Sequence, residues 1–176
     1  TLHGSLTALH LHGQIHFLDH RPNAPEKIGL YLQHLIYNTV RPAGSGDLSS
    51  RWVLPDEILT LPPVPAGQAA EILNGWLAYY LIGQTRPLPF FPKTSLAAAQ
   101  TLLSESKKSE DEKLQAARKA AATHYFGGKM NVGQADYAEV ALVFGKDETP
   151  PIESELFWLL VENLLLPTLS ALQEAV

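Results

Sequence analysis

A carboxylate and a guanidinium lie two residues apart at the end of the first apolar segment. The segment is LTALHLHGQIHFLDHR, residues 6–21, and it ends in Asp19, His20 and Arg21. Carboxylate oxygens are ligands that divalent cations prefer, and a cation beside them stabilises an attacked phosphate. The spacing is therefore typical of metal-dependent phosphodiester chemistry, which would need a second carboxylate to complete the metal site.

The residues before this acid predict the β-hairpin that would position it. Apolar and polar side chains alternate on both sides of a central glycine, which is typical of two paired strands. A three-residue loop, 12–14, would place Leu9 opposite Phe17 and Thr7 opposite Asp19. A two-residue loop would pair leucines with polar residues, so we favour the three-residue loop.

The predicted hairpin resembles the site of PD-(D/E)xK nucleases with one acid missing. Those enzymes place an Asp on one strand and an (Asp/Glu)-x-Lys on the next. Here Thr7 stands in the place of the first Asp, and Arg21 stands in the place of the Lys. A Thr hydroxyl is a poor ligand for Mg²⁺, and an Arg does not transfer protons near neutral pH. We therefore expect Thr7, Asp19 and Arg21 to form a vestigial site without catalysis.

Two alternatives to a vestigial site stay open. In the first, Asp19 and Arg21 are ordinary residues at the end of a strand. In the second, the chain is a divergent metal-dependent nuclease that uses Asp19. Such an enzyme would recruit its second carboxylate from elsewhere, for example from Glu26 or Glu57.

A second motif follows the predicted hairpin. RecB-type nucleases carry Gln-x-x-x-Tyr on the next helix, and the segment QHLIY supplies Gln33 and Tyr37. The two residues lie one helical turn apart and therefore on one face. Elsewhere such a pair is most often a core Tyr with a surface Gln. After a hairpin of this form, it supports the resemblance to these nucleases.

Histidines cluster in the first twenty residues. The predicted hairpin register would set His10 opposite His16, a pair that could bind Zn²⁺ or Ni²⁺. Without Cys or a third placed ligand, we favour solvated or partner-facing histidines and predict no metal site. The five histidines of the cluster are His3, His10, His12, His16 and His20.

Composition describes a folded chain without a strong charge field. The 176 residues are 45% hydrophobic and 18% charged, so we predict a single domain over 1–176. A net charge of −5 leaves nucleic acid to a local patch or to partner subunits. We expect no membrane span, because Glu162 and Asn163 interrupt the apolar run Leu156–Leu166. The absence of Cys and of an initiator Met favours a cytoplasmic fragment of a longer chain.

The predicted fold class is α+β, with a small sheet of two hairpins and one inserted helix, followed by a helical half. Residues 1–65 would form the hairpin–helix–hairpin core and residues 66–176 would be mainly helical. We expect the core to be a degenerate version of the nuclease fold. The second hairpin is RWVL and ILTL around Pro55–Glu57. Asn23 and Pro25 predict the start of a helix that runs as far as Asn38 or Val40. The other helices are predicted at Ala66–Ile82, Ser95–Ser104, Glu110–His124, Tyr137–Phe144 and from Ile152 onward, with a break or kink at Pro167.

The order of several motifs resembles the RecC family, the gamma chain of exodeoxyribonuclease V, in its C-terminal region. The most specific stretch is a helix that ends in Gly followed by a Pro-Leu-rich loop. The stretches that carry the resemblance are GQIHFLDHRPN, LYLQHLIYNT, SRWVLPDEILTLPPV, GWLAYYLIGQTRPLPFFPKTS and ENLLLPTL, in this order along the chain.

This resemblance implies a non-catalytic scaffold. RecC assembles with RecB and RecD subunits into an ATP- and Mg²⁺-dependent complex that unwinds and degrades DNA ends and responds to Chi sequences. Its C-terminal domain is related in fold to the RecB nuclease domain but has no nuclease activity. The domain itself would need no cofactor and would meet DNA through the complex.

Two contact surfaces follow as predictions. Arg86, Phe90 and Phe91 in the Pro-rich loop are candidates for contact with a partner or with DNA, although two Phe between prolines are more often buried. A further alternative is a stand-alone interaction module that uses the apolar helix Leu156–Leu172 as its contact surface.

Overall fold

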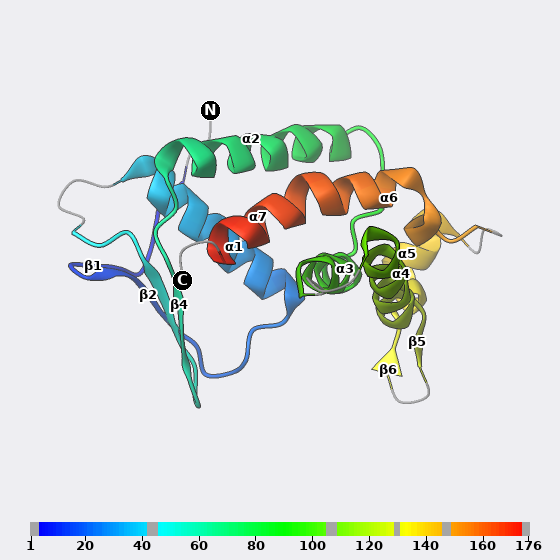
Figure 1. Cartoon of the computed structure of the whole chain (residues 1–176), viewed down its shortest axis with the longest axis horizontal. Helices are drawn as coiled ribbons and strands as arrows, with labels where there is room; N and C mark the ends of the chain where they lie inside the picture. Colours follow the sequence, from blue (N-terminus) through cyan, green and yellow to red (C-terminus); the bar gives the residue numbers. More distant parts are fainter. Residues whose placement is uncertain (1–3, 42–45, 105–108, 129–130, 146–148, 174–176) are drawn as a thin grey trace. The chain divides into compact units, whose positions relative to one another are not determined.

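The computed structural model describes residues 4–41, 46–104, 109–128, 131–145 and 149–173. They form a mixed α+β fold with a four-stranded sheet and a mainly helical second half (Figure 1). The chain divides into two compact units, which are Thr1–Gly75 with Ala171–Val176, and Trp76–Ser170. The predicted α+β class, small sheet and helical half are confirmed, whereas the nuclease-like character of the core stays a prediction.

The first unit is a sheet with one helix connecting its two central strands. The strand order is β1-β2-β3-β4, in which β2 and β3 are parallel and both outer pairs are antiparallel. Helix α1 lies between β2 and β3 along the chain, as a parallel pair requires. The elements are β1 (Leu9–His10), β2 (Gly13–Phe17), α1 (Ala24–Val40), β3 (Ser50–Val53) and β4 (Ile58–Leu61).

The predicted register of the first hairpin is wrong. Leu9 pairs with Gln14 and His10 pairs with Gly13, so the loop has two residues and the register is shifted. Gly13 begins β2 with a φ of 109°, and a Cβ there would lie 2.5 Å from the Ser49 carbonyl oxygen. The glycine therefore serves the close approach of β3 rather than the centre of a turn.

Helix α1 begins at a capping box. The Asn23 side chain accepts a hydrogen bond from the Glu26 amide at 3.1 Å, and the Glu26 carboxylate accepts one from the Asn23 amide at 2.8 Å. Pro25 occupies the first turn, where its missing N–H costs nothing. The helix start predicted from Asn23 and Pro25 is confirmed.

A chain of buried polar groups joins α1 to the sheet. His34 Nδ1 lies 2.7 Å from the Ser50 hydroxyl, and His34 Nε2 lies 2.9 Å from the Pro62 carbonyl oxygen. The Asn38 side chain donates to the Leu48 carbonyl at 3.1 Å and accepts from the Val64 amide at 2.9 Å. His34, Ser50 and Asn38 are fully buried, so this chain fixes how α1 lies on the sheet.

We expect the first unit to lose stability in mild acid because of His34. Burial lowers the pKa of His34 to about 4, and the hydrogen bond to the Pro62 carbonyl only partly offsets this. A histidine of the unfolded chain titrates near 6.5, so acidification protonates the unfolded state first. The free energy of unfolding should fall by about 3 kcal/mol between about pH 6.5 and pH 4.

Urea unfolding at several pH values, compared with His34→Gln, measures this effect. The variant is less stable at neutral pH, but its stability should depend less on pH in this window. Burial also lowers the pKa of His16, which leaves a smaller slope of the same sign. An equal slope in both proteins would contradict the assignment to His34.

The second unit is built from helices around an aromatic core. Phe91 is 3% exposed, and its ring centroid lies 5.0 Å from Tyr125, 5.3 Å from Phe144 and 6.4 Å from Phe157. Helix α2 begins in the first unit and continues into this one. The elements are α2 (Ala66–Gly83), α3 (Pro92–Ser104), α4 (Glu110–Phe126), β5 (Gly127–Gly128), β6 (Asn131–Val132), η1 (Gln134–Asp136), α5 (Ala138–Phe144), η2 (Pro151–Glu153), α6 (Glu155–Leu160), η3 (Val161–Leu165) and α7 (Leu166–Gln173).

The C-terminal helices accommodate Pro167 through a π-helical turn. The predicted break at this proline is wrong, because helical backbone continues on both sides of it. The alternative, a kink, stays a prediction. One turn earlier, η3 is a π-helix, and the Leu166 amide donates to the Val161 carbonyl five residues back. A proline cannot donate to the preceding turn, and the wider turn accommodates this loss.

The same region corrects the expectation about membrane spans. The helical segment Glu155–Leu172 has the length and composition of a span, although half of it is buried within the structure. This is weak evidence for a membrane, because a core helix passes the same test. Of its large apolar side chains, Leu159 is 38% exposed and most of the others are buried. The burial argues against the stand-alone module that would use this helix as its contact surface.

Candidate functional site at one end of the sheet

Asp19 and His20 lie just after β2, at the surface of the first unit. The Asp19 side chain is 96% exposed, and its carboxylate lies 2.7 Å from His20 Nδ1. The other imidazole nitrogen lies 3.2 Å from the Glu26 carboxylate. Hydrogen bonds to Asp19 and Glu26 raise the pKa of His20, and the bond to His20 lowers the pKa of Asp19. One imidazole therefore stands between two carboxylates.

Arg21 forms ion pairs with the turn that joins β3 to β4. Its guanidinium donates to Asp56 at 2.5 Å and lies 3.4 Å from Glu57. Arg21 thereby fastens the end of β2 to the second hairpin, whose predicted strands and turn are confirmed. Because all three side chains are more than a third exposed, this pairing contributes little stability.

These contacts bear on the alternative of a recruited carboxylate. Glu26 shares His20 with Asp19, and Glu57 pairs with Arg21, so a metal bridging either acid to Asp19 would first have to break these pairs. In the described ranges, no group of three His, Asp or Glu side chains is arranged to hold a metal ion. His10 faces Gly13 rather than His16, so the predicted histidine pair is wrong. His3 lies outside the described residues.

The structure does not bring the other predicted site residues to Asp19. Thr7 precedes β1 and is exposed, and the shifted register removes it from the position opposite Asp19. Tyr37 is buried, and its hydroxyl donates to the Asp47 carbonyl at 2.6 Å. Gln33 lines a cavity of about 450 Å³ with Ile36 and Leu73 on neighbouring helices. A vestigial role for these residues therefore stays a prediction.

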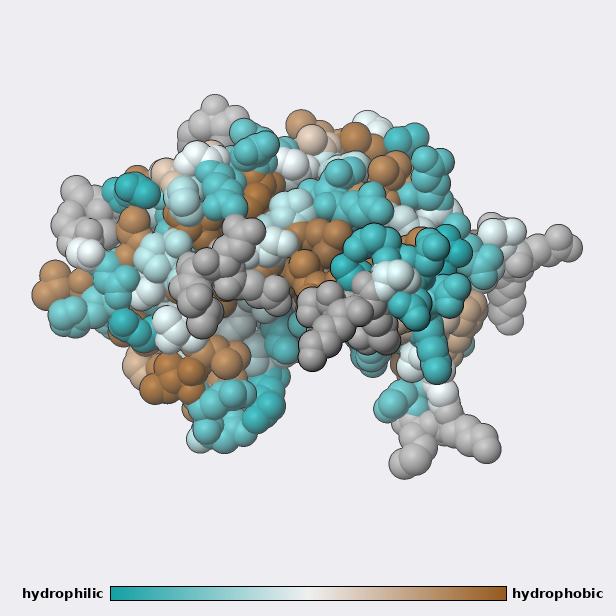
Figure 2. All heavy atoms as spheres, viewed as in Figure 1, coloured by the Kyte–Doolittle hydropathy of each residue, from teal (hydrophilic) through white to brown (hydrophobic). Residues whose placement is uncertain are grey.

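An exposed apolar row crosses the sheet beside Asp19 and Arg21. Phe17 pairs with Val53, and Val53 pairs with Ile58, so the three side chains share the face opposite α1. Phe17 is 74% exposed and Ile58 is 63% exposed. Figure 2 shows hydrophobic surface near the lower end of the sheet in Figure 1, where β2 ends and β4 begins, above a hydrophilic tip. We call these three residues the sheet-face row; alternation predicts that they share a face, but not that the face is uncovered.

The predicted contact residues of the Pro-rich loop lie in the second unit and differ in exposure. Arg86 is exposed, and Phe90 is half-buried, with its ring nearly perpendicular to that of Trp76 and the two ring centroids 5.6 Å apart. Phe91 lies in the aromatic core described above. Contact with a partner or DNA therefore stays a prediction for Arg86 and Phe90, and the ring of Phe91 is not at the surface.

Comparison with known families decides what this chain is. The family model described as the RecC C-terminal domain matches residues 1–103, which is more than half of the chain. The chain belongs to the RecC C-terminal domain family. No curated protein matches it.

Membership makes this a RecC domain, which associates it in general with exodeoxyribonuclease V and with DNA repair and recombination. The matched residues include the four-stranded sheet, α1 and the Pro-rich loop of this RecC domain. They also include the charged cluster, which we define as Asp19, His20, Arg21, Glu26, Asp56 and Glu57. Residues 104–176, which contain α4 and the C-terminal helices, lie outside the match.

Proposed function

We propose that this RecC domain is a non-catalytic scaffold of exodeoxyribonuclease V. It holds the RecB-type and RecD-type subunits together and supports strand handling while the cytoplasmic complex unwinds and degrades DNA ends and responds to Chi. ATP and Mg²⁺ serve the complex rather than this domain. The observation that carries the proposal is the uncovered sheet-face row next to a charged cluster that lacks a metal-binding arrangement.

The sheet-face row has the properties of a docking surface. Phe17 and Ile58 expose large apolar side chains, which a soluble domain gains stability by covering. The row ends at Arg21, Asp56 and Glu57, where the acids outnumber the cation. The partner surface that fits is an apolar patch with a basic rim on a RecB-type or RecD-type subunit.

The charged cluster supports the non-catalytic part of the proposal. Asp19 is fully exposed to water and hydrogen-bonded to an imidazole, whereas a catalytic metal needs several oxygen ligands that converge. The guanidinium of Arg21 is held by two acids and so is not positioned toward a phosphate near Asp19.

One experiment on the assembled complex tests both parts. Phe17→Asp combined with Ile58→Asp should weaken association of a partner subunit at least tenfold, because charges would be buried in an apolar contact. Asp19→Ala should leave both assembly and Mg²⁺-dependent DNA cleavage at the wild-type level. Leu142→Asp, at an 85% exposed position of the second unit, is the matched control and should have no effect on assembly.

Two results would overturn the proposal. Loss of cleavage in an Asp19→Ala complex that assembles normally would show that Asp19 is catalytic. Normal assembly of the Phe17→Asp, Ile58→Asp variant would show that the sheet-face row is not the docking surface.

A further inference from the structure

A polar and aromatic cavity lies in the second unit, outside the residues that match the family. It has a volume of about 560 Å³, within the range of small-ligand sites. Its walls come from α4, η2 and α6. The lining residues are Arg118, Lys119, Ala122, Phe126, Ile152, Glu153 and Trp158.

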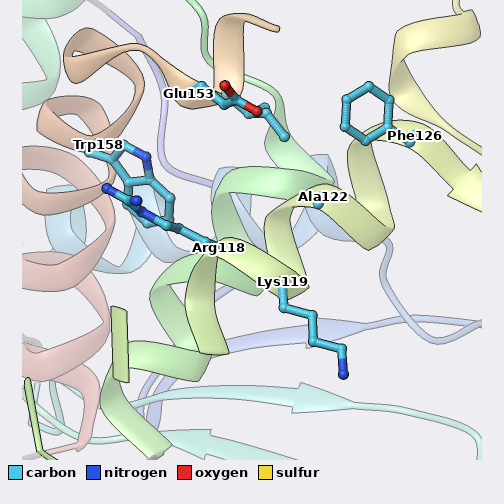
Figure 3. Close-up of a pocket in the computed structure, with 7 residues that line it drawn as sticks. Arg118, Lys119, Ala122, Phe126, Glu153 and Trp158 are labelled. Atoms are coloured by element: carbon cyan, nitrogen blue, oxygen red, sulfur yellow. The ribbon is translucent and has the colours of Figure 1, made fainter. Parts of the chain in front are cut away.

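Three charged side chains of this cavity have no ion-pair partner in the part of the chain that the structure describes. The Arg118 guanidinium lies over the Trp158 ring, 6.0 Å from its centroid. Figure 3 shows these two groups side by side, with Glu153 on the opposite wall and Lys119 pointing away from Trp158. Arg118, Lys119 and Glu153 are all exposed, so the cavity offers two cations and one carboxylate to a ligand.

Two aromatic surfaces accompany these charges. Trp158 is half-buried and lies beneath the Arg118 guanidinium, which is planar and can itself stack on a flat ring. Phe126, at the end of α4, is 52% exposed and borders the same cavity. A flat aromatic ligand could therefore stack on Arg118 or on Phe126.

The combination selects one chemical class of ligand. A bare anion would leave the aromatic surfaces unused and would be repelled by Glu153. An apolar ligand would desolvate three charges without pairing them. A nucleotide satisfies all of them, because its base stacks, its amino or imino groups donate to a carboxylate, and its phosphate binds a cation at the rim.

We propose that this cavity binds one nucleotide, with the base stacked on Phe126, its edge toward Glu153 and its phosphate at Lys119. The nucleotide is either free or one unit of a single strand. The inference extends the strand-handling part of the proposed function, but binding is measured on the protein without partner subunits. Its failure would therefore leave the assembly result unaffected, and the two outcomes are distinguishable.

Tryptophan fluorescence measures the binding directly. The protein is titrated with a dT oligonucleotide, with thymidine monophosphate and with inorganic phosphate. The emission should change with the oligonucleotide alone or with both nucleotide probes, and inorganic phosphate should leave it unchanged. Trp158→Phe should remove the signal while a competition assay still detects binding, because Trp52 and Trp76 lie elsewhere in the chain.

Variants then locate the contact. Phe126→Ala should weaken binding about tenfold, the effect of losing one stacked base. Lys119→Gln should weaken it about fivefold and reduce the slope of log K against log salt by about 0.7, the value for one lost phosphate contact on a single strand. Lys27→Gln and Tyr80→Ala are the matched controls for charge and for exposed aromatic area, and neither should change the affinity.

The relative affinities of the probes distinguish a single strand from a free nucleotide as the ligand. Tighter binding of the oligonucleotide than of the mononucleotide identifies a strand as the ligand, and equal affinities identify a free nucleotide. Absence of binding by both, equal binding of inorganic phosphate, or equal losses in the control variants would overturn the proposal.

Discussion

Asn38→Ala is expected to lower the free energy of unfolding by about 3 kcal/mol, since it leaves the buried Val64 amide and the part-buried Leu48 carbonyl without partners. In the structure the Asn38 side chain donates to the Leu48 carbonyl and accepts from the Val64 amide. Alanine can do neither, and the position is fully buried. Urea unfolding measures the loss, and faster hydrogen exchange of the Val64 amide would locate it.

The matched control for Asn38 is a second asparagine at the surface. Asn163 donates to the Tyr79 hydroxyl at 2.9 Å but is exposed, so Asn163→Ala should cost less than about 1 kcal/mol. Equal losses in the two variants would show that the buried polar chain does not hold α1 on the sheet.

Phe91→Ala is expected to cost about 4 kcal/mol, because a large ring is removed from a packed core and leaves a cavity. The ring contacts Tyr125, Phe144 and Phe157, and it is almost fully buried. Phe91→Leu keeps much of the volume and should cost less. Thermal or urea unfolding of the second unit measures both.

Comparison with Phe17→Ala distinguishes a residue of the packed core from a residue of a contact surface. Phe17 is 74% exposed, so its removal should change stability by less than about 0.5 kcal/mol while weakening partner association. If Phe91→Ala cost as little stability as Phe17→Ala and also weakened partner or DNA binding, Phe91 would be a contact residue rather than a core residue.

The helix starts could be predicted from sequence because their signals are local. Asn23, Pro25 and Glu26 form a cap within four residues, and no distant contact is needed to recognise it. Helix α3 begins three residues earlier than predicted, at Pro92, since the Ser95 hydroxyl accepts a hydrogen bond from the Phe91 amide at 3.2 Å. Such a bond across the predicted boundary extends the helix start into the proline loop.

The hairpin register could not be predicted because β3 decides it. The Gln14 amide donates to the Ser49 carbonyl at 3.0 Å, which draws Gly13 and Gln14 into the sheet instead of the loop. Ser49 lies far along the chain, and a local count of apolar pairs does not contain this contact. The predicted positions of Thr7 and of the pair of His10 and His16 depend on the same register and are wrong for the same reason.

The exposure of the sheet-face row could not be predicted for a related reason. Alternation shows that Phe17 and Asp19 share a face, but not which face of the sheet α1 covers. Contacts from α1, such as Tyr31 against Trp52 at 5.2 Å and His34 against Ser50, place the helix on the opposite side. The apolar residues next to the charged cluster are consequently exposed, which the sequence alone does not indicate.

Hydroxyl-radical footprinting of Phe17 and Ile58, in the free protein and in the complex with RecB-type and RecD-type subunits, tests the scaffold proposal most directly. Both side chains are exposed in the free protein and should be oxidised readily. On assembly we expect their oxidation to fall several-fold, while that of Leu142 stays unchanged. Unchanged oxidation of Phe17 and Ile58 in a complex that has formed would contradict the proposal that this face holds a partner subunit.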